Sequence, residues 1–194
     1  MAKLNDIITS RVRVKILELL LTDVREIYHV RGMVRQTNEE INAVRRELER
    51  LEKAGIVKKE PRGNRLYYWA RKDYSFFEDL LAIVSKSTGL GVEIIANQKK
   101  LGNLSFVMFS GKFARRKTRK KEDDVDVLVV GKVVLPELAT LIRAEESKRD
   151  GEINYTVMSR DELAFRKRRR DPFLLRILAE SRIMIIGDED DLVT

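Results

Sequence analysis

Residues 48–69 read LERLEKAGIVKKEPRGNRLYYW, and this stretch predicts the end of a helix followed by a β-hairpin. Gly55 comes directly after the helical pattern, and glycine is the commonest residue just beyond a helix C-terminus. The runs 56–60 and 65–69 are rich in strand-forming residues and are separated by the turn sequence PRGN. We therefore expect a helix, a short stop and a hairpin with a basic tip.

Two more helices are expected closer to the N-terminus. Ser10 can cap the first, because its hydroxyl can accept a hydrogen bond from an amide of the first helical turn. The second is predicted over about residues 27–35, and its apolar side chains Ile27, Val30 and Val34 are expected to face inward.

The helix that leads into the hairpin has its own start signal. Thr37 and Glu40 have the spacing of a capping box, in which each side chain accepts a hydrogen bond from a backbone amide at the helix start. The box predicts a helix from Thr37 to about Ala54. Its expected buried stripe consists of Ile41, Val44, Leu48 and Leu51.

Three helices followed by a basic-tipped hairpin is the order of a winged helix-turn-helix, and residues 48–69 are similar to winged-helix repressors of the ArsR type. The resemblance covers roughly residues 8–72 and implies that residues 1–72 form a domain that binds double-stranded DNA. Asn and Arg pair with base edges in the major groove, while a basic wing contacts phosphates or the minor groove. The expected DNA contacts are Asn38, Asn42, Arg45 and Arg46 on the third helix, and Lys58, Lys59, Arg62 and Arg65 on the wing.

Other residues of this region limit the interpretation. Glu39, Glu47 and Glu49 accompany the arginines and are expected to moderate the affinity for DNA. A winged helix that contacts only protein remains the alternative. His29 is the single histidine and the chain has no cysteine, so a metal-sensing repressor is not expected.

Residues 73–90 are expected to form a connector helix with a regular apolar face. The sequence TGLG at 88–91 then breaks the helix and marks a domain boundary. Two interpretations stay open for this helix: a linker packed on its neighbouring domains, or a dimerisation helix that would make the protein a homodimer.

A second informative stretch, residues 110–131, reads SGKFARRKTRKKEDDVDVLVVG. A glycine turn follows an apolar strand at 104–109, and a basic segment leads to Asp124 and Asp126, which are expected to open a strand over 125–130. Residues two apart on a strand share a face, so the two carboxylates are expected side by side. Like charges this close require a cation between them, and Mg²⁺ is the expected one.

This stretch resembles the signature of the DNA polymerase beta-like nucleotidyltransferases through Gly111, Phe113, Ala114, Arg115 and the two aspartates, although Lys112 replaces the family's serine and Arg116 often replaces a glycine. The resemblance implies a nucleotidyltransferase-like domain over 91–194. It also implies that Gly111, Lys112 and Arg115 bind the phosphates of an NTP, and that Asp124 and Asp126 hold Mg²⁺. Glu152, on a strand predicted over 152–158, is the expected third catalytic carboxylate, and Asn154 is the alternative at that position.

Composition and charge complete the expectations. The formal net charge of +8 favours an anionic partner, and a second basic cluster lies at 166–170. No leader or membrane span is expected, and a cytoplasmic location fits. We therefore expect an α+β chain in which a winged helix-turn-helix precedes a small mixed-sheet nucleotidyltransferase-like domain. Such a protein would be a DNA-binding transcriptional regulator that senses a nucleotide with Mg²⁺. The alternatives are an active enzyme that transfers NMP to a protein, RNA or small-molecule hydroxyl, and a scaffold.

Overall fold

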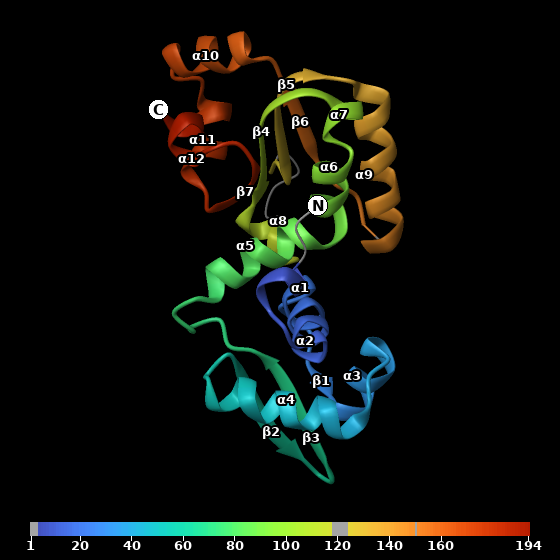
Figure 1. Cartoon of the computed structure of the whole chain (residues 1–194). Helices are drawn as coiled ribbons and strands as arrows, with labels where there is room; N and C mark the ends of the chain where they lie inside the picture. Colours follow the sequence, from blue (N-terminus) through green and yellow to red (C-terminus); the bar gives the residue numbers. More distant parts are fainter. Residues whose placement is uncertain (1–3, 118–123, 150) are drawn as a thin grey trace. The chain divides into compact units, whose positions relative to one another are not determined.

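The computed structural model describes residues 4–117, 124–149 and 151–194 (Figure 1). The chain divides into two compact units, Met1–Ser87 and Thr88–Thr194. Each unit combines helices with one β-sheet, so the expected α+β class is confirmed. Within the described residues, no helix is both long enough and apolar enough to cross a lipid bilayer.

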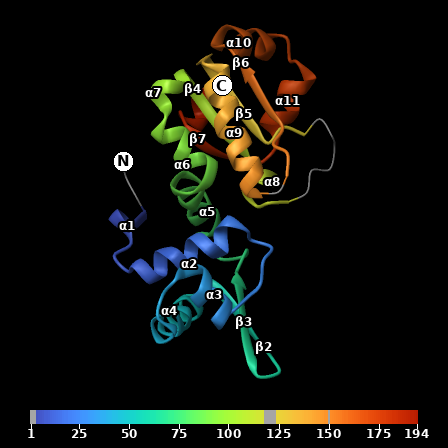
Figure 2. The same ribbon diagram turned by 90° about the vertical axis from the view of Figure 1, so that its right-hand side faces the viewer.

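The first unit places its helices before and after a small antiparallel sheet. Ser10 caps the first long helix as expected, since its Oγ accepts a hydrogen bond from the amide of Arg13 at 3.3 Å. The hairpin also forms where it was expected, and Figure 2 shows it extending beyond the helices of this unit. The elements are α1 (Leu4–Ile7), α2 (Arg11–Thr22), β1 (Tyr28–His29), α3 (Val30–Thr37), α4 (Ile41–Lys53), β2 (Val57–Arg62), β3 (Arg65–Ala70) and α5 (Phe77–Ser87), and the strand order is β1-β3-β2.

The predicted start of the second helix was wrong. Tyr28 and His29 form β1, which pairs with Tyr68 and Tyr67 of β3, and α3 begins only after this strand. Ile27, which was expected to face inward, is 40% exposed. Helical periodicity in a short apolar run cannot reveal a hydrogen-bonded partner that lies almost forty residues further along the chain.

The predicted capping box was wrong as well. Thr37 ends α3, and its Oγ1 donates a hydrogen bond to the carbonyl oxygen of Met33 at 2.8 Å. Asn38 then adopts the left-handed conformation, with φ of 52°, and closes α3. Glu40 caps α4 by itself, because its carboxylate accepts a hydrogen bond from the amide of Ala43 at 2.9 Å.

The buried stripe of α4 is largely as predicted. Val44, Leu48 and Leu51 are almost fully buried, while Ile41 is only half-buried. Gly55, with φ of 76°, lies just beyond the helix and allows the chain to turn into β2.

The second unit is built around a mixed four-stranded sheet in the order β6-β5-β4-β7, in which only β5 and β6 run parallel. One face of the sheet packs against α10, α11 and α12 through Phe106, Met108, Leu128, Leu174 and Leu192. In Figure 1, α6, α7 and α9 lie on the other side. The elements are α6 (Gly89–Ala96), α7 (Gln98–Leu101), β4 (Gly102–Ser110), α8 (Gly111–Ala114), β5 (Val127–Val133), α9 (Leu135–Arg149), β6 (Tyr155–Met158), α10 (Arg160–Arg168), α11 (Pro172–Ala179), β7 (Arg182–Ile186) and α12 (Glu189–Val193).

Two strand starts in this unit differ from the predictions, and both matter for the candidate site. β5 begins at Val127, so neither Asp124 nor Asp126 lies on a strand. β6 begins at Tyr155, so Glu152 and Asn154 precede the strand on which they were expected. The expectation that alternation along a strand would direct these side chains to one face therefore does not apply to them.

Candidate functional site

Helix α4 presents a basic surface opposite its buried stripe. Asn42, Arg45 and Arg46 are exposed, whereas the apolar residues of the same helix are buried against α2 and α3. Exposed asparagine and arginine on one helix are suited to hydrogen-bonding with nucleic-acid bases and phosphates. Asn38 is exposed too, but it belongs to the end of α3 and does not lie on α4 as expected.

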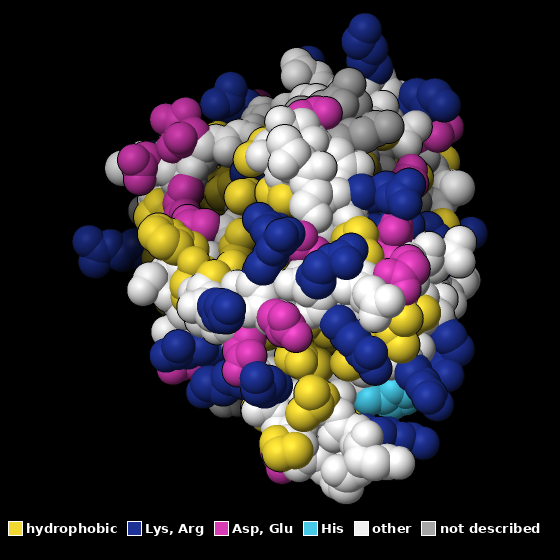
Figure 3. Space-filling model, turned by 60° about the horizontal axis from the view of Figure 1, so that its bottom comes forward, with side chains coloured by type: hydrophobic (Ala, Val, Ile, Leu, Met, Phe, Trp, Pro, Cys, Tyr) yellow, Lys and Arg dark blue, Asp and Glu magenta, His cyan; other side chains and the backbone are white. Residues whose placement is uncertain are grey.

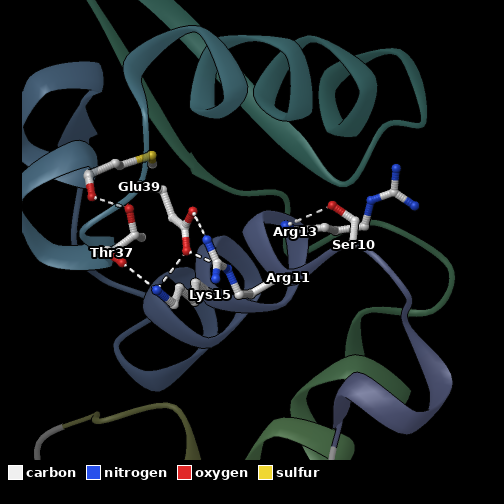
Figure 4. Close-up of polar contacts among 7 residues, drawn as sticks. Ser10, Arg11, Arg13, Lys15, Thr37 and Glu39 are labelled. Atoms are coloured by element: carbon white, nitrogen blue, oxygen red, sulfur yellow. Dashed lines mark hydrogen bonds and ion pairs between the residues drawn. The ribbon is translucent and has the colours of Figure 1, made fainter.

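Two acids that were expected to weaken this surface are turned into the fold. The carboxylate of Glu39 accepts hydrogen bonds from Lys15 at 2.6 Å and from Arg11 at 3.0 Å, both on α2 (Figure 4). Lys15 also donates to the carbonyl oxygen of Thr37 at 2.8 Å, so one ammonium group holds both the end of α3 and the start of α4. Glu39 is therefore a structural residue of the unit interior.

Glu47 has the same role about two helical turns further along the chain. Its side chain is 6% exposed and accepts hydrogen bonds from Arg13 of α2 at 2.9 Å and from Arg50 at 2.6 Å. Burial alone would raise the pKa of Glu47, but the two arginines outweigh it and the pKa is lowered. The pKa of Glu39 is also lowered, chiefly by its hydrogen bonds from Lys15 and Arg11. Both carboxylates are thus ionised and paired with basic side chains inside the unit. Of the three acids expected to moderate DNA binding, only Glu49 is exposed.

The wing residues Lys58, Lys59, Arg62 and Arg65 are all exposed, as the resemblance requires. Three of them have acidic neighbours on the surface. Lys59 lies 2.7 Å from Glu52, Arg62 lies 2.9 Å from Glu60, and Lys58 lies 3.5 Å from Asp73. Exposed ion pairs of this kind are weak and can exchange for phosphate oxygens at little cost.

A groove of about 470 Å³ lies between α4 and the hairpin. Arginines enter it from three elements, namely Arg31 of α3, Arg45 of α4 and Arg65 of β3, together with one acid, Glu49. Lys and Arg side chains are spread over the face of the molecule seen in Figure 3. Sequence reasoning found Arg45 and Arg65 but missed Arg31, because nothing in the spacing of α3 indicated that its first turn would face the hairpin.

In the second unit, the basic side chain of Lys112 has internal partners. The ammonium group of Lys112, the residue expected to bind phosphate, lies 3.0 Å from Oδ2 of Asp124 and 2.6 Å from Oε1 of Glu180. These hydrogen bonds, the one to Glu180 first, raise the pKa of Lys112. The cation beside Asp124 in this structure is therefore a side chain of the chain itself.

The other two predicted phosphate ligands also have internal partners. The amide of Gly111 donates to the carbonyl oxygen of Ser181 at 2.6 Å, and Nη1 of Arg115 donates to the carbonyl oxygen of Gly111 at 2.8 Å. The approach to Ser181 explains the glycine, because a Cβ at position 111 would lie 2.1 Å from the Ser181 hydroxyl. Gly111 thus has a packing role here that does not depend on a nucleotide.

Asp124 and Asp126 are both buried and both contact Asn154. Oδ2 of Asp126 accepts a hydrogen bond from the backbone amide of Asn154 at 3.0 Å, and the Asn154 side-chain amide donates to the carbonyl oxygen of Asp124 at 3.0 Å. The residue next to the aspartates is thus the asparagine, while Glu152 is exposed in the segment before β6. Asparagine can support these carboxylates but cannot act as a base.

Across residues 4–117, 124–149 and 151–194, no group of three or more His, Asp or Glu side chains is placed to hold a metal ion. Part of the basic segment between Gly111 and Asp124, residues 118–123, lies outside the described residues. Sequence reasoning missed Glu180, because it lies far from the motif in the sequence and only the pairing of β7 with β4, in which Ser110 lies opposite Arg182, brings it to Lys112.

No protein-family model matches this chain, and no match was found among curated proteins or solved structures.

Proposed function

We propose that the first unit binds double-stranded DNA as a winged helix and that the protein regulates transcription. In this proposal α4 enters the major groove and the β2–β3 hairpin contacts the backbone or the minor groove beside it. The observation that carries the proposal is the sorting of charge on α4. Glu39 and Glu47 are buried against cations of α2, while Asn42, Arg45 and Arg46 are exposed.

The groove between α4 and the hairpin supports the same function. Arg31, Arg45 and Arg65 line it from separate elements, and several arginines around one groove can contact more phosphates than a single arginine can. Glu49 also lines it and would disfavour indiscriminate binding of polyanions.

A binding-site selection from random duplexes, followed by affinity measurements at fixed salt, tests the proposal. The parent chain should prefer the selected duplex over a scrambled one. Arg46→Ala should lose about 1–3 kcal/mol of this discrimination if the side chain makes a bidentate base contact. Arg143→Ala, which removes an exposed arginine from α9 of the other unit, should leave the preference intact. Absence of duplex binding by the parent chain, or unchanged preference in Arg46→Ala, contradicts the proposal.

The role of the second unit stays a prediction from the sequence. For a nucleotide to bind with Mg²⁺ at Asp124 and Asp126, Lys112 would have to exchange Asp124 and Glu180 for phosphate oxygens. Calorimetry with each NTP and Mg²⁺ tests sensing, and the Asp124→Asn/Asp126→Asn variant is the comparison. Transfer of labelled α-phosphate to protein or RNA tests the enzymatic alternative. The predicted homodimer is tested by light scattering.

A further inference from the structure

The basic cluster at the end of α10 forms a surface that the proposed DNA-binding unit does not include. Arg168, Arg169 and Arg170 are exposed, and so is Arg160 at the start of the helix. Cations at a helix C-terminus are favoured by the helix dipole, which explains one or two of these residues. It does not explain the exposed aromatic ring of Phe165 in the same surface, which is 49% exposed.

Two acids of this region, Glu162 and Asp171, contact one arginine, and a third, Asp161, is exposed in the first turn of α10. Nη2 of Arg166 lies 2.8 Å from Glu162, and its Nη1 lies 3.5 Å from Asp171. Asp171 also caps α11 by accepting a hydrogen bond from the amide of Leu174 at 2.9 Å. These carboxylates therefore oppose Arg166 more than they oppose the exposed arginines at 168–170.

Two hollows flank α10, and they differ in chemistry. One, of about 330 Å³, is lined by Phe165 and Arg169 together with the paired residues Glu162, Arg166 and Asp171. In it the guanidinium of Arg169 lies 5.0 Å from the centre of the Phe165 ring. This hollow combines an aromatic surface with a cation beside it.

The second hollow, of about 320 Å³, brings together Arg160, Lys167 and Arg168 on the other flank of the helix, with Asp191 of α12 as the acid that faces them. The guanidinium of Arg160 also lies 5.7 Å from the centre of the Phe106 ring. Three cations against one carboxylate make this hollow suitable for an anionic group such as a phosphate.

We propose that α10 is a binding surface for single-stranded nucleic acid, in which an unpaired base stacks on Phe165 while phosphates lie along Arg160, Arg168 and Arg169. Stacking on an exposed aromatic ring accompanied by a basic track is the usual way in which proteins hold single strands without sequence preference. A duplex is a poorer fit, because its bases are stacked on one another and cannot cover the ring. This surface would give the protein a second nucleic-acid contact, independent of the one proposed for α4.

Fluorescence anisotropy with the full chain tests the proposal, using labelled 12-nucleotide oligo(U) and oligo(dT) and a mixed-sequence duplex. Arg168→Gln/Arg169→Gln should weaken single-strand binding by about tenfold, and the slope of log affinity against log salt should fall in magnitude by about 1.4 for two lost phosphate contacts. Lys99→Gln/Lys100→Gln removes the same charge from exposed positions of α7 and should have a much smaller effect.

Phe165→Leu separates stacking from charge, since it keeps an apolar side chain and the net charge. It should weaken single-strand binding by about fivefold or more and leave duplex binding unchanged. Equal losses in the two double variants, or no loss in Phe165→Leu, would overturn the proposal in favour of a general polyanion effect. Stronger binding to anionic lipid vesicles than to oligonucleotides would overturn it in favour of a membrane surface. Because all the substituted side chains are exposed, unchanged circular dichroism and thermal melting should accompany each result.

Discussion

The α4 surface and the surroundings of Lys112 both combine acidic with basic side chains but pair them in opposite ways. Glu39, just before α4, and Glu47 on α4 are buried with cations of α2, and the arginines of α4 are exposed. Around Gly111, the basic side chain of Lys112 is held by Asp124 and Glu180. The comparison shows that a cluster of charged residues in a sequence predicts a ligand-binding site only once the partners of those side chains within the protein are known. By this criterion α4 is better prepared for an anionic partner than the Lys112 region is.

The largest expected effect tests whether Gly111 is a packing residue. In Gly111→Ala the new Cβ would lie 2.1 Å from the Ser181 hydroxyl, 2.5 Å from Nη1 of Arg115 and 3.0 Å from the Ser181 carbonyl oxygen, so both side chains must move and the backbone contact is tight. We expect a loss of about 3 kcal/mol in the free energy of unfolding of the second unit, measured by urea denaturation. Gly151→Ala is the control and should be nearly neutral, because a Cβ added there would meet no atom of the described residues within 4 Å. An unchanged free energy of unfolding in Gly111→Ala would contradict the packing role. It would favour the alternative that Gly111 is needed for ligand binding.

Lys112→Met should have the next largest effect. It removes the Lys112 ammonium group from Asp124, whose side chain is 9% exposed, and a buried carboxylate that loses a cationic neighbour is destabilising. The side chain of Glu180 is 37% exposed, so water can solvate it once Lys112 is gone. We therefore expect the free energy of unfolding to fall by about 2 kcal/mol, less than for breaking a fully buried ion pair.

The double variant Lys112→Met/Asp124→Asn is the control for this interaction. It removes both charges and should recover part of the lost stability in a double-mutant cycle. Additive losses in the cycle would show that Lys112 and Asp124 do not stabilise one another.

Glu47→Gln tests the α4 surface, where a buried acid is paired with arginines. Losing the charge opposite Arg13 and Arg50 should cost about 1–2 kcal/mol at pH 7, a moderate value because both arginines are partly exposed. Since the pKa of Glu47 is lowered in the folded protein, its contribution is present above the usual carboxyl pKa of 4.5 and disappears as the pH falls through the lower folded value. The parent chain and the variant should therefore converge in stability at acid pH. A difference that persists below that range would assign the loss to packing.

Glu52→Gln should have the smallest effect on stability. It tests whether the acid beside Lys59 of the β2–β3 hairpin weakens duplex binding. Glu52 and Lys59 are both partly exposed, so the thermal midpoint should stay within experimental error. Removing an acid beside the wing should increase duplex affinity at low salt by about twofold, and the increase should vanish at high salt. Weaker duplex binding in this variant would indicate that Lys59 needs Glu52 to hold its position.

Several parts of the fold were predicted correctly from local pattern. The Ser10 cap, the stripe of Val44, Leu48 and Leu51, and the β2–β3 hairpin depend on residues that lie close together in the sequence. Helix caps, helical periodicity and turn residues act over a few positions, so their signals survive without knowledge of the rest of the fold.

The errors have a common cause. Thr37 looked like a cap because Glu40 follows at the right spacing, yet its hydroxyl bonds backward to Met33 and the chain turns at Asn38. Glu152 looked like a strand residue because of alternation, yet β6 begins at Tyr155. In each case a hydrogen bond or strand pairing elsewhere outweighed the local preference.

The sequence by itself determined which residues are charged, where the basic clusters lie, and most but not all of the helical and extended segments. Only the tertiary structure decided which charges meet. Lys15 reaches Glu39, Arg13 reaches Glu47 and Lys112 reaches Glu180 across separations of 24, 34 and 68 residues. The physical reason is that burying a carboxylate requires a cation and hydrogen-bond donors within about 3 Å, and the partner can come from any segment that packing brings there.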